Sequence, residues 1–159
     1  MKKIKSLLLL LLVGFVTISL TACGEKNVEG SLEEIMTKVY ADLNDDEKPM
    51  MLGNIEVNEE MDNVESFIGT KEIEYEEILA SESMVGSIAH SVVLVRMKDG
   101  ADIESAKSKI KETVNPRKWI CVGVEKEDVI VKNKGNLIIL IMVENETTRN
   151  KLEQGFDNL

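Results

Sequence analysis

The sequence predicts an α+β fold, in which a mixed or antiparallel sheet of about five strands packs against helices. Two observations carry this prediction. Apolar residues recur every three or four positions in segments 31–44 and 101–114, which is typical of amphipathic helices. Apolar runs rich in β-branched residues at 90–98 and 137–143 are typical of strands, and short connections in the C-terminal third favour antiparallel hairpins.

Local signals define where the helices begin and end. Ser31 and Glu34 have the spacing of a capping box, in which each side chain satisfies a free amide at a helix start. Gly69 and Pro116 are typical residues just beyond a helix end. The expected helices cover residues 31–44, 59–68, 101–114 and 146–159.

The strands follow from shorter patterns. Residues 137–143 are seven apolar residues in a row, which favours a central strand buried on both faces. Cys121 lies in another expected strand, where a cysteine is usually a small buried hydrophobe. Residues 50–58 remain ambiguous. The expected strands cover residues 72–80, 90–98, 118–125, 128–132 and 136–143.

The N-terminus carries a targeting signal. Three lysines among the first five residues precede an unbroken apolar run over residues 7–13. Small residues then lead into a cysteine at Leu20-Thr21-Ala22-Cys23. A charged start, an apolar stretch and small residues before a cut are typical of a secretory signal peptide. The segment Leu20-Thr21-Ala22-Cys23 resembles the lipobox of bacterial lipoproteins.

This resemblance implies that Cys23 is acylated and becomes the new N-terminus after cleavage. The protein is then expected on the extracytoplasmic side of the cell membrane, with the membrane as its partner through lipid at Cys23. The alternative is an uncleaved transmembrane helix over residues 4–22, close to the roughly 20 residues needed to span. The expected organisation is a signal peptide over 1–22, a tether over 23–30 and a single α+β domain over 31–159.

The mature chain is strongly acidic. After residue 22 it holds 16 basic and 29 acidic side chains, a formal charge of −13. Segment 29–82 carries 17 acids against three lysines. This charge argues against nucleic acid as a partner. The acidic half leaves cations or a basic partner open, although a run of charge is usually a solvated face.

His90 is the only histidine and a candidate general base toward Ser87 or Ser91. Adjacent side chains of a strand point to opposite faces, so His90 and Ser91 are a poor catalytic couple. No Gly-x-Ser-x-Gly elbow is present to hold a nucleophile. A structural role for His90 is therefore favoured over a catalytic one.

Arg117 and Trp119 form the other weak candidate. They flank Lys118 where the expected helix meets a strand, and an exposed tryptophan beside cations can stack on a sugar or bind a partner. A tryptophan that covers the edge of the core is the favoured alternative.

No metal ligand set or cofactor is expected. Asp42, Asn44 and Asp46 have the alternating spacing that opens a calcium loop, but Glu47 stands where such a loop needs glycine. One histidine and one cysteine beyond Cys23 also make the usual zinc ligand sets improbable.

Several segments together resemble a known family. They are SIAHSVVLVR at 87–96, KDGAD at 98–102 and PRKWICVGV at 116–124, together with the acidic opening helix and the strand at 135–142. The family comprises short lipoproteins of Gram-positive anaerobes and is numbered 4358 among the domains of unknown function. The resemblance implies no activity, and it is only loosely associated with cell-surface polysaccharide acylation.

Three functional hypotheses remain. The first is a membrane-anchored, non-catalytic module that binds another component of the cell envelope, such as a protein. The second is an extracytoplasmic hydrolase or transferase that uses His90, a serine and an acid. The third is a module that binds a small ligand or a cation. The first predicts an exposed apolar or aromatic patch, and the second needs His90 in an open cleft.

Overall fold

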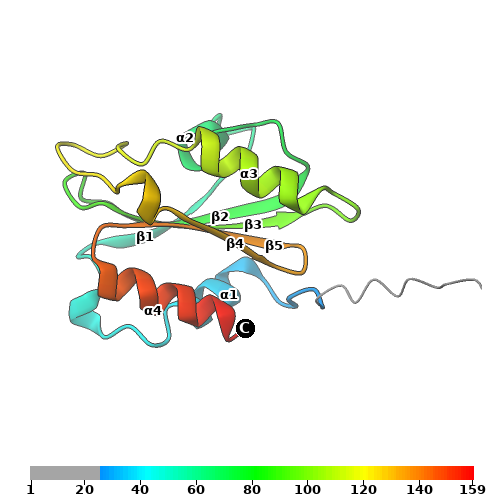
Figure 1. Ribbon diagram of the computed structural model, residues 1–159. Coiled ribbons are helices and arrows are strands. Elements are labelled where there is room, and N and C mark those ends of the chain that lie inside the picture. The colour runs from blue at the N-terminus through cyan, green and yellow to red at the C-terminus, as the bar shows by residue number, and fades with distance from the viewer. Residues whose placement is uncertain (1–25) are drawn as a thin grey trace, which may run out of the picture.

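The computed structural model describes residues 26–159, which form a central sheet between two layers of helices (Figure 1). Two short 3₁₀ helices, Asp45–Glu47 and Lys126–Asp128, lie in the connections. The helices are α1 (Leu32–Val39), α2 (Val64–Ile68), α3 (Ile103–Thr113) and α4 (Glu146–Asp157). The strands are β1 (Leu52–Glu56), β2 (Tyr75–Ser83), β3 (His90–Met97), β4 (Ile130–Lys134) and β5 (Leu137–Val143).

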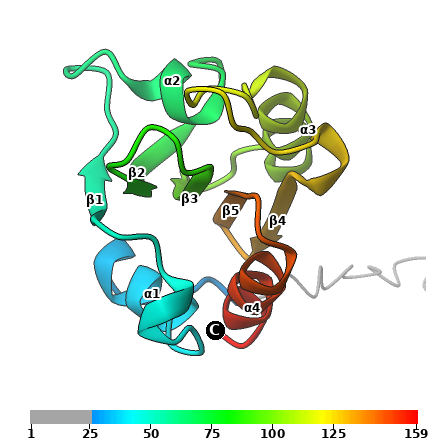
Figure 2. The ribbon, with the colours of Figure 1, turned by 90° about the vertical axis from the view of Figure 1, so that its left-hand side faces the viewer.

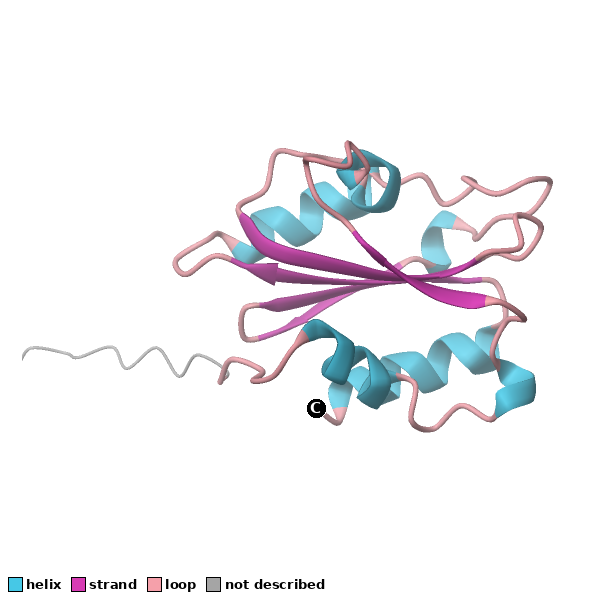
Figure 3. Ribbon diagram, turned by 180° about the vertical axis from the view of Figure 1, so that it is seen from behind, coloured by secondary structure: helices cyan, strands magenta, loops and turns pink. Residues whose placement is uncertain are grey.

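The sheet has five strands in the order β1-β2-β3-β5-β4, and every neighbouring pair is antiparallel. Helices α1 and α4 cover one face, and α2 and α3 cover the other (Figures 2 and 3). The α+β prediction is confirmed, and of its two forms of sheet the antiparallel one is found.

The two central strands divide the core between the two faces. Along β5 the odd-numbered residues from Leu137 pack toward α1 and α4, while the even-numbered residues from Ile138 pack toward α2 and α3. All seven residues of β5 are buried. This confirms the prediction of a strand covered on both faces. A strand with only one covered face would alternate between apolar and polar residues.

The helix ends follow the local signals. Ser31 caps α1 and Glu34 completes the capping box. Gly69 ends α2 with φ 78°, and an added Cβ there would lie 2.4 Å from the backbone of Thr113. The helix α2 is shorter than the one predicted over 59–68, because residues 59–62 form turns, in which Asp62 has φ 51°.

The predicted strand over 118–125 is wrong. This segment is a loop, whose Ile120 and Val124 amides donate to the carbonyl oxygens of Gly86 and Pro116. Cys121 has φ 63° and is exposed, so its predicted burial in the core is also wrong. The fifth strand of the sheet is β1, from the ambiguous segment 50–58.

The segment that precedes α1 leaves the domain at one end of the sheet. Arg96 donates to the carbonyl oxygens of Val28 and Gly30, and the Asn136 amide donates to the Asn27 side chain. Within residues 26–159, no helix is long and apolar enough to cross a membrane. The predicted signal peptide, transmembrane alternative and lipid attachment at Cys23 lie outside the described residues.

Candidate functional site

Polar side chains interrupt the apolar core at the end of β2 and the start of β3, far from the segment that precedes α1. Glu82 and Ser91 are cross-strand partners on the face covered by α2 and α3. Ser81 and His90 lie on the opposite face, because side chains alternate along a strand. These four are among the buried polar residues of the described chain.

His90 is sealed beneath α1. It is 3 % exposed, and its Nε2 lies 2.7 Å from the hydroxyl oxygen of Tyr40. Burial lowers the pKa of His90 to about 4, so the ring is neutral at pH 7. Burial also raises the pKa of Tyr40, which keeps its hydroxyl protonated and able to donate to a neutral ring nitrogen. His90 therefore lacks the open cleft that a general base requires.

On the other face, Glu82 collects two donors from the loop after α3. The Lys118 ammonium lies 2.8 Å from one carboxylate oxygen, and the Trp119 indole N–H donates to the other over 2.9 Å. Lys118 also lies 3.2 Å from the Ser91 hydroxyl. The loop reaches this position because the Ile120 amide is held by the carbonyl oxygen of Gly86.

This cluster forms the floor of an open hollow of about 550 Å³. The Lys118 ammonium lies 4.6 Å from the centre of the Phe67 ring and 5.3 Å from that of Trp119. Burial lowers the pKa of Lys118, and the neighbouring carboxylate of Glu82 partly offsets the effect. The residues that line the hollow are Glu65, Ser66, Phe67, Glu82, Asn115, Lys118 and Trp119.

Two polar groups at the hollow are poorly placed to act on a bound molecule. Ser91 is fully buried, so a substrate in the hollow does not reach its hydroxyl. The Lys118 charge is already paired with Glu82. What the hollow offers a ligand is the ring surface of Phe67 and Trp119, with polar groups at their edges, which is the usual composition of a binding pocket.

Beside the hollow, exposed apolar side chains form what we call the apolar tip: Met50, Met51, Met84 and Ile120. They are between 59 % and 77 % exposed. The Met84 amide donates to the carbonyl oxygen of Met51, and the side chain of Ile120 lies against Gly86. These contacts thus bring exposed apolar side chains from three segments of the chain to the same end of the sheet.

The structure places the two weak candidates, Trp119 and Arg117, in different surroundings. Trp119 is half-buried, so it both packs against the core and lines the hollow. Arg117 is exposed and points instead to Glu125, with 2.5 Å between the charged groups. Sequence reasoning missed Glu82 as a site residue. Glu82 lies beyond the strand expected over 72–80, and only the register of β2 and β3 places it opposite Ser91.

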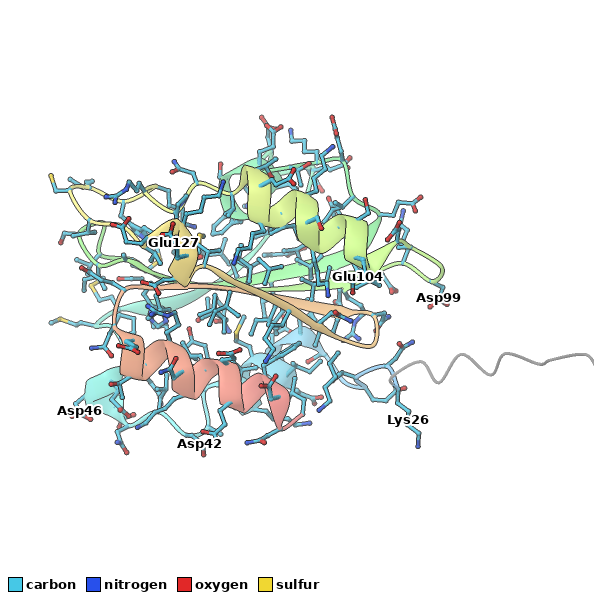
Figure 4. All side chains as sticks on the ribbon, viewed as in Figure 1. Lys26, Asp42, Asp46, Asp99, Glu104 and Glu127 are labelled. Atoms are coloured by element: carbon cyan, nitrogen blue, oxygen red, sulfur yellow. The ribbon has the colours of Figure 1, made fainter. Side chains whose placement is uncertain are left out.

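The suspected calcium loop has another role. Residues 45–47 form a short 3₁₀ helix, and both carboxylate oxygens of Glu47 bind Lys151, at 2.6 and 2.7 Å. Asp42 and Asp46 are exposed and lie on the outer surface (Figure 4). Among the described residues, no three carboxylate, histidine or cysteine side chains are grouped so as to hold a metal ion.

Comparison with known proteins adds no assignment: no protein-family model, curated protein or solved structure matches this chain.

Proposed function

We propose that this chain is a lipoprotein of the bacterial cell envelope, related to the family numbered 4358 among the domains of unknown function. Lipid at Cys23 anchors it to the extracytoplasmic side of the membrane. Its domain is a non-catalytic binding module, and the end that carries the apolar tip and the hollow receives another envelope component. The observation that carries this proposal is the position of that end, opposite the segment that leads to Cys23.

The strand β3 relates the two ends. Its Arg96 holds Val28 and Gly30, whereas its Ser91 contacts Lys118 at the floor of the hollow. Five residues of extended strand span roughly 17 Å. The loop that carries Trp119 and Ile120 (yellow in Figure 1) lies at the other end of the sheet from Lys26 (labelled in Figure 4). An anchor at Cys23 thus leaves the tip facing away from the lipid.

The surface at this end fits a binding function. Soluble domains rarely gather large apolar side chains on one exposed patch, and such patches usually mark contact sites. Methionine adapts its shape to varied partners, since its side chain is unbranched and polarisable. The charge of −13 keeps the rest of the mature chain soluble and holds it away from an anionic membrane surface.

The anchor is tested by labelling cells with radioactive palmitate and following the full chain through membrane fractionation. The wild-type protein is expected to be labelled and membrane-bound. The variant Cys23→Ala is expected to carry no label. Labelled Cys23→Ala protein, or unlabelled wild type, contradicts the lipoprotein proposal.

Binding at the tip is tested by placing a photo-activated crosslinking residue at Ile120 in cells. A discrete adduct is expected from position 120. Met61 is the matched control, because it is also an exposed apolar residue, at 61 %, but it lies in the turns before α2. Equal adducts from both positions, or none from position 120, contradict a binding tip.

The hollow itself favours a second candidate, a small ligand such as a sugar ring. Its volume of about 550 Å³ and its two aromatic rings suit a ligand that stacks. Titration with cell-wall oligosaccharides, followed by Trp119 fluorescence, tests this candidate. A change in emission that saturates, and that disappears in Phe67→Ala, supports it. Unchanged emission at millimolar sugar contradicts it.

A further inference from the structure

The two edges of the sheet are built differently. The β4 edge is tied to the helices beside it: Lys132 pairs with Glu153 and Asp157 of α4, and Lys107 of α3 donates to Asn133. Lysines on an edge strand discourage pairing with another chain. The β1 edge carries no lysine, and its neighbours in the chain are the exposed Met50 and Met51.

Hydrogen bonding shows which backbone groups of β1 face outward. The Val57 amide donates to Ile78, and Met51 accepts from the Met84 amide, so the odd-numbered residues bond to β2. Hydrogen-bonded and non-bonded pairs alternate along an antiparallel ladder. The N–H and C=O groups of Leu52 and Asn54 therefore point away from the sheet.

These outward groups have no partner within residues 26–159. The edge closes at Glu56, whose carbonyl oxygen accepts from the side chain of Asn63. The open stretch is short, and it runs from the apolar tip at Met51 to this closure. Unpaired backbone groups of an edge strand are a template for an added strand.

The closed end of β1 borders an acidic groove of about 260 Å³ beside α1. Glu33, Glu56 and Glu76 line it, and none of the three forms an ion pair with another described residue. Glu77 lines it too, but Arg96 neutralises its charge over 2.7 Å. The groove thus offers uncompensated negative charge along the path that leads from the edge.

We propose that β1 is a site of strand addition for an extended segment of a partner protein, apolar at one end and rich in lysine or arginine at the other. The apolar end lies on the tip beside Met51 and Met84. The backbone pairs with Leu52 and Asn54, and the basic end reaches Glu56 and the groove. This inference rests on the proposed binding function and names the partner of the same end of the molecule.

Charge complementarity selects this occupant over a second copy of the chain. Segment 29–82 holds 17 acids and three lysines, and Lys48 and Lys71 are already paired with Asp45 and Asp62. Two such surfaces brought together repel each other, whereas a basic segment gains attraction at the groove without losing the backbone pairing.

Position 54 offers a matched pair of variants. Asn54→Pro removes an outward N–H and places a ring on the open edge. It leaves the ladder to β2 intact, because that N–H does not bond to β2. Asn54→Ala removes the same side chain but keeps the N–H. Since the Asn54 side chain is exposed and accepts or donates no hydrogen bond within the described residues, both variants are expected to fold.

The probe is a synthetic peptide of alternating valine and threonine, with leucines at one end and lysines at the other, made in both orders. Fluorescence polarisation is measured with the full chain in detergent. We expect one order to bind wild type and Asn54→Ala within about twofold of each other, and Asn54→Pro about tenfold or more weakly. Glutamates in place of the lysines are expected to abolish binding.

Equal binding to Asn54→Pro and Asn54→Ala overturns strand addition, and so does an absence of binding by wild type at millimolar peptide. If crosslinking at Ile120 still gives its adduct, neither result contradicts the proposed binding function. If position 120 gives no adduct while Asn54→Pro still weakens peptide binding, the β1 edge remains the binding site and the apolar tip is not in contact with the partner.

Discussion

His90 and Ser91 are neighbours in the chain, yet the sheet places them in contrasting surroundings. His90 lies beneath α1 with Tyr40 as its partner, closed to solvent. Ser91 lies beneath Lys118, in a cluster that opens into a hollow of about 550 Å³. The difference comes from what covers each face: a well-packed helix on one side and a loop on the other. A sealed polar pair contributes to stability, whereas the polar cluster under the loop borders a hollow that is open to solvent.

The largest expected effect concerns the sealed side and is a dependence of stability on pH. Burial lowers the pKa of His90 to about 4 from 6.5, so below pH 6.5 the unfolded chain takes up a proton that the folded chain does not. Stability is therefore fully present above pH 6.5 and falls as the pH drops toward 4, by roughly 3 kcal/mol in total.

Urea unfolding of wild type and His90→Gln measures this effect between about pH 7.5, one unit above the ordinary pKa of histidine, and about pH 4, the pKa of His90 in the folded chain. Glutamine keeps an acceptor for Tyr40 but does not titrate in this range. The variant is expected to lose less stability over the interval than wild type. Parallel curves contradict the account of a sealed, neutral His90.

The second effect concerns the open side. Lys118→Met keeps the aliphatic stem beside Phe67 but leaves Glu82 with only the Trp119 N–H as a donor. The side chains of Glu82 and Lys118 are 12 % and 17 % exposed, so the unpaired carboxylate is poorly solvated. We expect a loss of about 2 kcal/mol in the free energy of unfolding.

The double variant Glu82→Gln with Lys118→Met is the control for that loss. Glutamine is neutral and still accepts from Trp119, so the double variant is expected to recover part of the stability. The single variant Glu82→Gln completes the comparison. If the double variant loses as much stability as Glu82→Gln and Lys118→Met lose separately when added together, the two side chains are solvated and not coupled.

A smaller effect returns to the sealed side. Tyr40→Phe leaves the ring in place and removes only the hydroxyl that meets His90 Nε2 at 2.7 Å. We expect a loss of about 1 kcal/mol, because a buried acceptor loses its donor. Chemical denaturation at pH 7.5 measures it, a pH chosen about one unit above the ordinary pKa of histidine. If Tyr40→Phe loses more unfolding free energy than Lys118→Met, the predicted order of the two variants is wrong.

Sequence spacing predicted those features that depend on a few neighbouring residues. The capping box of Ser31 and Glu34, the buried strand β5 and the opposed directions of His90 and Ser91 follow from spacing alone, and the structure confirms them. The strand expected over 118–125 was wrong, because a short apolar run does not distinguish a strand from a loop that packs on the core.

The hollow depends on contacts that spacing cannot reveal. Glu82 meets Ser91 through the register of β2 and β3, and it meets Lys118 only because the loop folds back onto the sheet. The close approach of Gly123 fixes that return, since an added Cβ there would lie 2.9 Å from the carbonyl oxygen of Pro116. The open edge at β1 was missed for the same reason: a short strand of mixed composition is visible only once its partner is known.

The smallest effect separates Arg117 from its neighbour Lys118 and completes the comparison. The Arg117 side chain is 64 % exposed, and its partner Glu125 is 68 % exposed. Arg117→Met keeps the stem that packs beside Gly123 and removes the charge. An exposed ion pair contributes little, so the free energy of unfolding is expected to change by less than about 0.5 kcal/mol. Chemical denaturation beside Lys118→Met measures both. If Arg117→Met lowers the free energy of unfolding as much as Lys118→Met does, the ion pair between Arg117 and Glu125 holds the loop in place. The burial of Glu82 then depends on this exposed ion pair as well as on Lys118.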